Sequence, residues 1–476
     1  MLGWEFPPFI SGGLGTACYG LTKAMSSLGT DILFVLPRPV STPFSTHVRL
    51  VSAQANSPLS GPAAEFRLDE FQNVTFRTID AQLTSPYLSP QKGMRQEKVV
   101  TTGHKLIPIQ GSSSVSTLQA QANPSVTGSQ APSLESQTSE STSGNASDLF
   151  TEVHRYATLA AEVARNESFD VVHAHDWMTF PAGMAVAAAA GVPLVVHVHS
   201  TEFDRSGSNI DTRIYDIERQ GMHAATKIIA VSYLTKAMLT HHYGVDASKV
   251  EVVYNAIEAN GNGPALPVRE GNWDIQKDER IVLFLGRITM QKGPEYFLAA
   301  AKKVLEVMQN VRFVMAGSGD LTRRTIEMAN EMGIGDKVLF TGFLKGPDVE
   351  RVFKMADLYV MPSVSEPFGI APLEAMNNDV PVIISKQSGV SEVLNHVLKV
   401  DFWDVDEMAN KIVAVLKHAP LATMLRKEGS IEVGKLNWAD AAKRCVEVYN
   451  AAIEIGPWVK LPLNPAQPPL STAAAR

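Results

Sequence analysis

The chain has 476 residues, too many for one compact domain, and this length predicts two or three domains. Hydrophobic residues make up 45% of the chain and charged residues 19%, which is the composition of an ordinary soluble globular protein. The net charge of −7, from 42 Lys+Arg against 49 Asp+Glu, excludes a nucleic-acid binder that relies on bulk positive charge, although a local basic pocket for phosphate is compatible with it.

Cysteine usage and hydropathy predict a cytoplasmic protein without a transmembrane segment. Cys18 and Cys445 lie too far apart in sequence to indicate a metal cluster or a disulfide framework, which favours a reducing compartment. The start of the chain lacks the basic region of a signal peptide. The most apolar stretch, residues 181–198, contains Gly191-Val192-Pro193, a break between a helix and a strand rather than part of a membrane span. Peripheral membrane contact and oligomeric state are left open.

Short runs rich in Val, Ile and Leu alternate with helical segments along most of the chain. Runs of this kind, each followed by a helix, are typical of parallel strands buried on both faces. The predicted strands are residues 2–4, 31–36, 170–173, 194–198, 227–231, 281–285, 312–316, 337–341, 358–362 and 380–384. They indicate an α/β protein with open doubly wound sheets, in which ligands bind at the carboxyl ends of the strands.

The first change in composition is an insertion. Residues 111–147 consist mostly of Ser, Thr, Gln, Ala and Gly, and cannot bury enough apolar surface to order themselves. We therefore expect a disordered insertion spanning about 90–147. A helix at 148–166 would follow it, with Ser147 or Asp148 as its N-cap.

The second change in composition divides the chain into domains. Residues 258–271 are rich in Gly, Pro and Asn, which predicts an interdomain linker. Each side of the linker holds its own series of strands and helices, in residues 1–257 and 272–437. Two similar Rossmann-like domains would then face each other across a cleft. A tail rich in Pro and Ala, residues 457–476, is expected to be loose.

Two features could bind phosphate. Gly12 and Gly13 precede a predicted helix at 16–28, where glycines let the backbone approach a phosphate at the helix N-terminus. A tight turn without a ligand is the alternative, because Gly-rich turns are common. Arg287 and Lys292 follow the strand at 281–285, so both cations could converge on one diphosphate at a strand end. The alternative is a solvated loop that carries two surface charges.

A third feature pairs two carboxylates. Glu366 lies in a loop whose Pro367 and Gly369 restrict its shape, and a helix is expected to start near Ala371. Glu374 would then sit about one turn into that helix, so that both carboxylates face the same opening. Carboxylates accept hydrogen bonds from sugar hydroxyls. Enrichment of acidic residues in a first helical turn explains Glu374 without a ligand, but not the rigid loop around Glu366.

Two histidine pairs end neighbouring strands, His173 with His175 and His197 with His199. Such spacing can indicate a metal site, but no cysteine or carboxylate set completes four ligands, and we predict no metal. At least one histidine of each pair is expected to be a hydrogen-bonded core residue. The histidine nearer the end of each strand would reach the cleft.

Taken together, these motifs resemble those of the retaining, nucleotide-sugar-dependent glycosyltransferases of family 4 (group 1), which have the GT-B fold and are similar to glycogen and sucrose synthases. The resemblance runs from Trp4 to about Tyr449, outside the insertion, and implies that the last helix, residues 438–456, packs back on the first domain. It is carried by Gly12-Gly13-Leu14-Gly15, His173-Ala174-His175-Asp176-Trp177, His199, Val231-Ser232-Tyr233-Leu234-Thr235-Lys236, Asn255, Gly286-Arg287, Lys292-Gly293, Glu366-Pro367-Phe368-Gly369 and Glu374.

The resemblance implies a role for each charged residue of the site. Arg287 and Lys292 would neutralise the donor diphosphate as it leaves, Glu366 would hold the hydroxyls of the donor sugar, and Glu374 would hold the ribose. The donor would be a nucleoside-diphosphate sugar, with UDP-glucose or a relative favoured. No metal or other cofactor is expected.

Other positions would complete the site. Gly12, Gly13 and Gly369 would contact the donor, with Gly13 approaching the diphosphate from the first domain. His199 would contact the sugar near the reacting carbon, and Asp176 would line the acceptor side. The implied activity is transfer of a hexosyl group to a carbohydrate or other hydroxyl acceptor whose identity the sequence leaves open.

Three other functions are compatible with parts of this pattern. An ADP-glucose-dependent glycogen or starch synthase would carry Lys where this chain has Ser11 and would lack a counterpart of Glu374. A nucleotide-sugar epimerase on the same fold would not combine Arg287 and Lys292 with paired glutamates. A non-catalytic binding protein is disfavoured because the charged residues of the site are all present. The first strand is also shorter than in the family, which calls into question either the integrity of that edge of the sheet or the assigned start of the chain.

Overall fold

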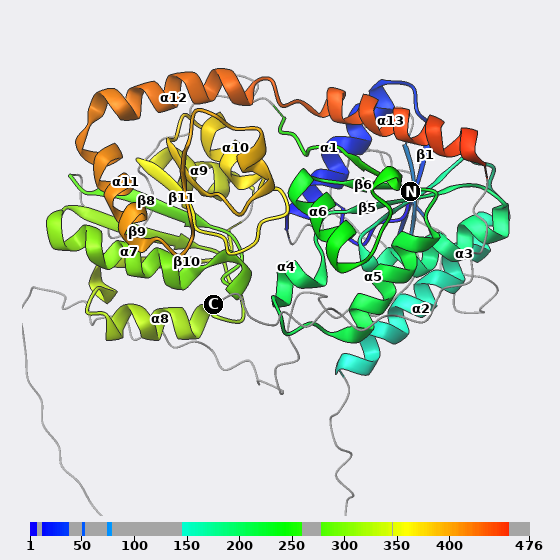
Figure 1. Cartoon of the computed structure of the whole chain (residues 1–476), viewed down its shortest axis with the longest axis horizontal. Coiled ribbons are helices and arrows are strands. Elements are labelled where there is room, and N and C mark those ends of the chain that lie inside the picture. The colour runs from blue at the N-terminus through cyan, green and yellow to red at the C-terminus, as the bar shows by residue number, and fades with distance from the viewer. Residues whose placement is uncertain are drawn as a thin grey trace, which may run out of the picture.

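The computed structural model describes residues 1–6, 12–37, 50–52, 74–78, 145–258, 278–344 and 346–456. They form two α/β domains that lie side by side (Figure 1). Most of the predicted insertion and linker, and the whole tail 457–476, lie outside the described residues. Within the described segments, no helix is both long and apolar enough to cross a membrane.

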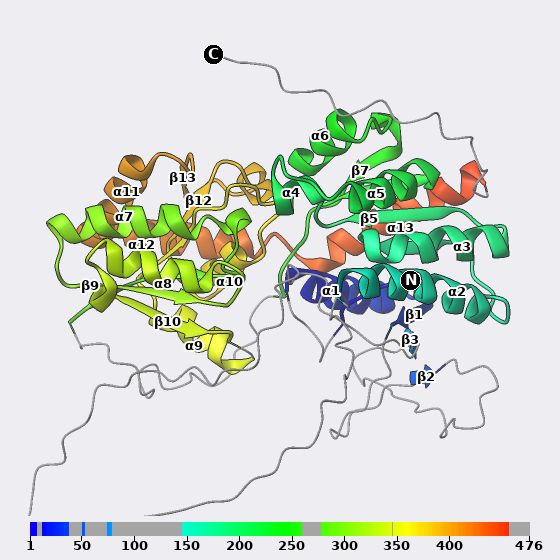
Figure 2. The same cartoon turned by 90° about the horizontal axis from the view of Figure 1, so that it is seen from below.

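The first domain is built on a parallel sheet (Figure 2). Two parts of this sheet, in the orders β2-β3-β1 and β4-β5-β6-β7, are joined through Leu2, which bridges Val35 of β1 and Ala174 of β4. Of the two doubts raised about the short first strand, the one about the sheet edge is answered, because Leu2 lies inside the sheet and is buried. The strands are β1 (Ile32–Leu36), β2 (Leu50–Ser52), β3 (Val74–Thr78), β4 (Val172–His175), β5 (Leu194–Val198), β6 (Lys227–Ala230) and β7 (Val250–Val252).

The second domain has a six-stranded parallel sheet in the order β10-β9-β8-β11-β12-β13. This is the doubly wound arrangement, in which the strand order reverses between the first strand of the domain, β8, and β11. A crevice opens at the carboxyl ends of the two strands that flank such a reversal. The strands are β8 (Arg280–Leu285), β9 (Val311–Ala316), β10 (Val338–Gly342), β11 (Leu358–Met361), β12 (Val382–Ser385) and β13 (Leu398–Val400).

Helices cover both faces of each sheet, as predicted for α/β domains. In the first domain they are α1 (Gly13–Ser27), α2 (Asn145–Ala164), α3 (Phe180–Ala190), α4 (Glu202–Ser206), α5 (Thr212–Ala224) and α6 (Tyr233–His242). In the remainder they are α7 (Pro294–Val307), α8 (Thr322–Glu331), α9 (Pro347–Met355), α10 (Ala371–Asn377), α11 (Val405–Lys417), α12 (Ala419–Val433) and α13 (Trp438–Ile455). Helix α1 begins three residues before the predicted start, and α2 begins at Asn145, so neither Ser147 nor Asp148 is its N-cap.

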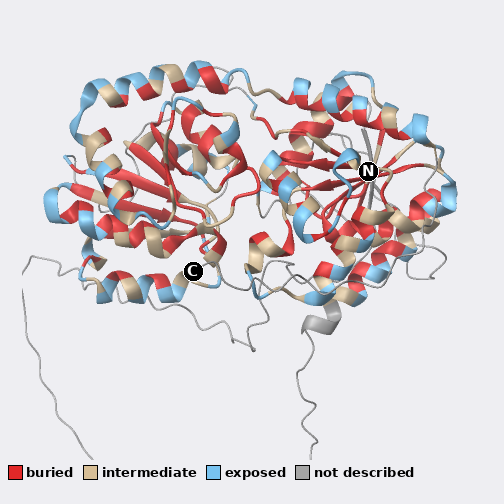
Figure 3. Ribbon diagram, in the orientation of Figure 1, coloured by how far each residue is buried: buried red, intermediate tan, exposed pale blue. Residues whose placement is uncertain are grey.

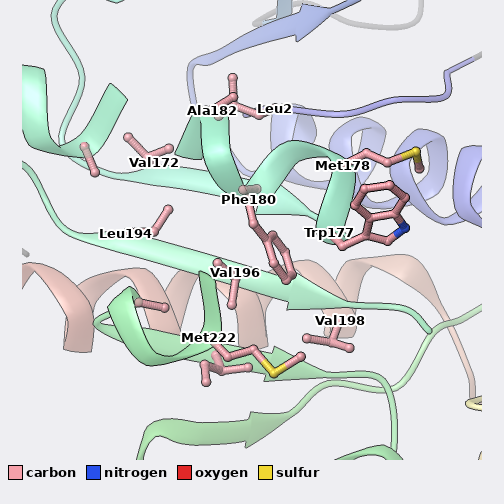
Figure 4. Close-up of a cluster of buried hydrophobic side chains, with 14 of the residues drawn as sticks. Leu2, Val172, Trp177, Met178, Phe180, Ala182, Leu194, Val196, Val198 and Met222 are labelled. Carbon is pink, nitrogen blue, oxygen red and sulfur yellow. The ribbon is translucent and has the colours of Figure 1, made fainter. Parts of the chain in front are cut away.

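Alternating side chains of the first sheet fill two separate cores. On β5, Leu194, Val196 and Val198 pack with α3 and α5, and Figure 4 shows them beside Phe180 and Met222. Val195, on the other face, belongs to the core that α1 and α13 cover. Figure 3 shows the central strands β4, β5, β11 and β12 buried along their length. Because strand residues alternate between the faces, the histidines of β4 and β5 point toward α1 and α13.

Helix α13 belongs spatially to the first domain, although it follows the second in sequence (Figure 1). Its buried Trp438, Cys445 and Tyr449 share a core with Cys18 and Met25 of α1. Cys18 and Cys445 are both free and buried. The chain therefore crosses between the domains twice, which ties their positions together.

Candidate active site

A cavity of about 620 Å³ lies between the two domains, at the carboxyl ends of strands from both sheets. Its volume is in the range of sites that enclose a small molecule. The residues that were assigned a role in donor binding, catalysis or the acceptor side all line it: Gly12, Gly13, Asp176, His199, Arg287, Lys292, Glu366, Gly369 and Glu374. The cavity thus brings together residues from strand ends far apart in the chain, and the roles predicted for them stay predictions.

The first domain contributes the N-terminus of α1. Gly12 precedes the helix in extended conformation, and a Cβ added to Gly12 or Gly13 would meet no atom within 4 Å. The first turn carries no acidic residue, and no side-chain cap hydrogen bond is made at Gly12. Backbone amides at the start of a helix attract anions, so this end of the cavity suits a phosphate.

The second domain contributes two cations after β8. Lys292 ends the short helix Met290–Lys292, and its Nζ lies 2.5 Å from Oε2 of Glu366. The Lys292 side chain is only 21% exposed, so the alternative of a freely solvated loop does not hold for it. Arg287 lines the same cavity, and its Nη2 lies 3.5 Å from Oε1 of Gln291, a buried neighbour that sequence reasoning did not select.

Glu366 is held on several sides. Besides Lys292, the Ser363 hydroxyl donates to its Oε2 at 3.1 Å, and the side chain is almost fully buried. Its backbone N–H donates to Gln387, and its carbonyl accepts from the N–H of Gly389. Gly369 has a φ of +107° and a Cβ there would lie 3.2 Å from Cγ of Glu366, so a side chain at Gly369 would strain the loop and crowd the carboxylate.

Glu374 occupies the first turn of α10, as predicted, and reaches the same cavity. Burial raises the pKa of this carboxyl from 4.5 to about 7. At neutral pH Glu374 is therefore poised between the protonated and ionised forms. A ligand that donates hydrogen bonds to the carboxylate would favour the ionised form.

Asp176 and His199 occupy adjoining positions on the opposite wall. The Asp176 carboxylate accepts hydrogen bonds from the backbone N–H groups of His199 at 2.7 Å and Ser200 at 3.4 Å. Burial nevertheless raises the pKa of Asp176 to about 7, since desolvation outweighs these bonds. Asp176 also has a φ of +58°, an uncommon backbone conformation for this residue type. Burial lowers the pKa of His199 to about 3, so His199 is neutral.

The other histidines stay beneath the cavity. His199 reaches the cleft as predicted, but His175 does not, because it is fully buried with its Nδ1 3.0 Å from Nε2 of His199. His173 bonds through Nδ1 to the Tyr449 hydroxyl at 2.5 Å. His197 is also buried, yet neither of its ring nitrogens has a hydrogen-bond partner among the described residues. The prediction of a hydrogen-bonded core histidine therefore fits His173 but is wrong for His197.

The three buried histidines are grouped closely enough to be considered as a metal site. Nitrogen atoms of His173, His175 and His197 lie within 4.8 Å of one another, close enough to be candidate ligands. However, this group contains no carboxylate or thiolate, whereas closed structural zinc sites use four ligands. Burial also lowers the pKa of all three rings, which leaves them neutral without a metal.

Comparison with known proteins gives matches in both domains. The family model described as Glycosyltransferase Family 4 matches residues 135–260, and that described as Glycosyl transferases group 1 matches residues 269–431. An uncharacterized glycosyltransferase of Methanocaldococcus jannaschii is 33% identical over 302 residues, covering 61% of this chain and 77% of that protein.

Solved structures share the two-domain fold. Sucrose-phosphate synthase from Thermosynechococcus elongatus has a TM-score of 0.63 at 18% identity and covers 95% of this chain and 98% of its own. Anabaena HepE, in complex with UDP and glucose, has a TM-score of 0.53 at 19% identity and covers 63% of this chain and 83% of its own. At such identities these likenesses show the fold alone.

Proposed function

The chain belongs to the group 1 glycosyltransferases, transferases that act on sugars, and on this premise we propose that it moves a glucosyl group from UDP-glucose, or a close relative, to a hydroxyl acceptor with retention of configuration. The proposal rests on one observation: two cations, Arg287 and Lys292, and two carboxylates, those of Glu366 and Glu374, line the same interdomain cavity. HepE, which shares the fold, is a protein that binds UDP and glucose.

The cations would act on the leaving group. As the bond between the sugar and the diphosphate breaks, negative charge grows on the diphosphate oxygens. Arg287 and Lys292 face the same cavity as the N-terminus of α1, so positive charge surrounds that position from both domains. Charge that is already in place stabilises a transition state without reorganisation, and this is usually the largest catalytic contribution. We therefore propose that no metal ion is required.

The carboxylates would orient the donor. Glu366 would accept hydrogen bonds from the sugar hydroxyls, and its ion pair with Lys292 would join the sugar and diphosphate subsites. Glu374, on a separate element, would accept from the ribose hydroxyls. Neutral His199 would contact the sugar beside the reacting carbon. Asp176 would line the acceptor side, with a carbohydrate or another hydroxyl compound as acceptor.

The test is a thermal-shift panel of UDP-, ADP- and GDP-sugars, followed by measurement of nucleoside diphosphate release. A ligand at about 100 times its Kd stabilises the fold by about 2.7 kcal/mol. We expect UDP-glucose to raise the Tm most, and the Arg287→Ala/Lys292→Ala variant to lose that rise.

Each alternative predicts a different result in the same panel. Stabilisation by ADP-glucose alone would favour the glycogen or starch synthase alternative. Interconversion of UDP-sugars without release of UDP would favour an epimerase. Binding without any turnover across a panel of acceptors would indicate a non-catalytic binding protein.

A further inference from the structure

The segment that starts α6 was noted as a motif of the family, yet it has no role in the reaction described above. Ser232 and Thr235 are both buried and do not line the cavity. The Ser232 hydroxyl donates to the backbone carbonyl of Pro367 at 2.6 Å, and the Thr235 hydroxyl lies 3.4 Å from the same oxygen. Both contacts cross from the first domain to the second. Their target is the residue that follows Glu366.

A second contact reaches the residue that precedes Glu366. The Ser365 hydroxyl donates to Oδ1 of Asp204 at 2.6 Å. Asp204 is buried, and its other oxygen accepts from the backbone N–H and the hydroxyl of Thr201, which caps α4. The Asp204 carboxylate is therefore already oriented by its own domain before Ser365 reaches it.

The close approach of the two domains at this point requires a glycine. A Cβ on Gly389 would lie 2.1 Å from the Pro367 carbonyl oxygen and 2.5 Å from Cβ of Ser232. Three residues later, the Glu392 carboxylate accepts hydrogen bonds from the backbone N–H groups of Tyr233 at 2.9 Å and Leu234 at 2.7 Å. Glu392 thereby binds the free amides at the N-terminus of α6 and holds the same two segments together.

We propose that Ser232 and Asp204 are positioning residues that form an interdomain clamp. Ser232 bonds to the carbonyl of Pro367 and Asp204 to the hydroxyl of Ser365, and these two contacts fix the position of Glu366, which lies between them in the chain. Contacts within the second domain hold the Glu366 carboxylate and backbone, and the clamp adds contacts from the first domain on either side of Glu366. The clamp itself is a statement about how the loop at residues 365–367 is held. Its effect on sugar transfer rests on the function proposed above.

The clamp is tested with Ser232→Ala and Ser365→Ala, singly and together. Thr240→Ala is the matched control, because Thr240 lies on the same helix, is partly exposed and donates its hydroxyl to the carbonyl of Ala237 within α6. Hydrogen exchange of the Glu366, Gly389 and Val390 amides is followed without ligand. We expect exchange roughly three- to tenfold faster in each clamp variant, the factor that loss of one neutral hydrogen bond produces, and no change in the control.

Kinetics supplies the second readout. UDP affinity should stay within about twofold, because the diphosphate and ribose subsites keep their residues, while turnover should fall about tenfold. If Ser232→Ala fails to fold, Ser365→Ala still reports on the other side of Glu366.

The outcomes separate the clamp from the proposed function. Unchanged exchange together with unchanged turnover in the double variant would overturn the clamp, even if the wild-type protein transfers glucose. Faster exchange at the three amides, in a protein that turns over no nucleotide sugar, would support the clamp and overturn the function.

Discussion

Replacement of Lys292 by alanine tests the proposed chemistry and the stability of the site together. The Nζ of Lys292 lies 2.5 Å from Oε2 of Glu366, with side chains 21% and 8% exposed. Loss of one preorganised charge at a developing anion typically lowers turnover by about 10²–10³-fold, or about 2.7–4 kcal/mol. We expect a loss of this size at saturating UDP-glucose.

The same substitution leaves the Glu366 carboxylate buried without its cation. Loss of one partner of a fully buried ion pair costs about 3–5 kcal/mol. Because Lys292 is partly exposed at a cavity, we expect a smaller loss of about 1–2 kcal/mol in unfolding free energy. A lysine on a freely solvated loop could be replaced with little effect on folding, and the ion pair with Glu366 is the reason to expect a loss here.

Release of UDP and thermal unfolding are measured on the same set of variants. Lys443→Ala is the control, because Lys443 pairs with Asp440 on the surface and should change neither quantity. Lys292→Ala/Glu366→Gln should regain stability, since the unpaired charge is gone, but not turnover. Lys292→Arg should recover turnover only in part, because a planar guanidinium does not replace a compact ammonium. Near-normal turnover of Lys292→Ala at saturating donor would refute the proposed role.

Three further predictions concern pH, packing and metal. Because the pKa of Glu374 is raised to about 7, affinity for UDP-glucose measured by titration calorimetry should rise from about pH 6 to about pH 8, and Glu374→Gln should abolish that rise. The same raised pKa means that the ligand-free fold loses stability as pH rises from about 4.5 to about 7, where the unfolded chain is ionised and the folded carboxyl is still protonated. A Cβ on Gly20 would lie 2.2 Å from the Trp438 ring, so Gly20→Ala should force α1 and α13 apart and lower the free energy of unfolding by about 1–3 kcal/mol in a thermal unfolding experiment. Gly434→Ala is the control and should cost less, because a Cβ there would meet its nearest atoms at 3.6 Å, an ordinary contact distance. Dialysis against a chelator should leave turnover unchanged, and a loss that zinc restores would show that the buried histidines hold a metal.

Much of the fold was predictable because buried parallel strands have a strong sequence signal. The strand at 194–198 was predicted with the bounds that the structure shows, since its continuous apolar run is flanked by a Gly-Val-Pro break and a polar end. The three-residue strands β7 and β13 were not predicted, because so short a run does not stand out from a loop. The place of Leu2 between β1 and β4 depends on long-range pairing that no local pattern encodes.

In the site, too, features with a local sequence signal were predictable and contacts between distant segments were not. Strand ends converge at one edge of each sheet, so the residues that were assigned a role in the site line the cavity, whereas the motif residues Ser232 and Thr235 do not. Pairings between residues far apart in sequence were not predictable, among them Lys292 with Glu366 and Ser365 with Asp204. A strand pattern also does not reveal which histidine reaches solvent. His175 ends its strand yet lies under His199.

If the proposed function is right, the residues of this cavity break the bond between a sugar and a nucleoside diphosphate and transfer the sugar with retention of configuration. Proton NMR of UDP-glucose incubated with the chain and a panel of carbohydrate and other hydroxyl acceptors tests it most directly. We expect UDP signals together with a newly formed glucoside in the α configuration of the donor, and neither with the Arg287→Ala/Lys292→Ala variant. A β-configured product, or a UDP-sugar converted to another without release of UDP, would contradict it.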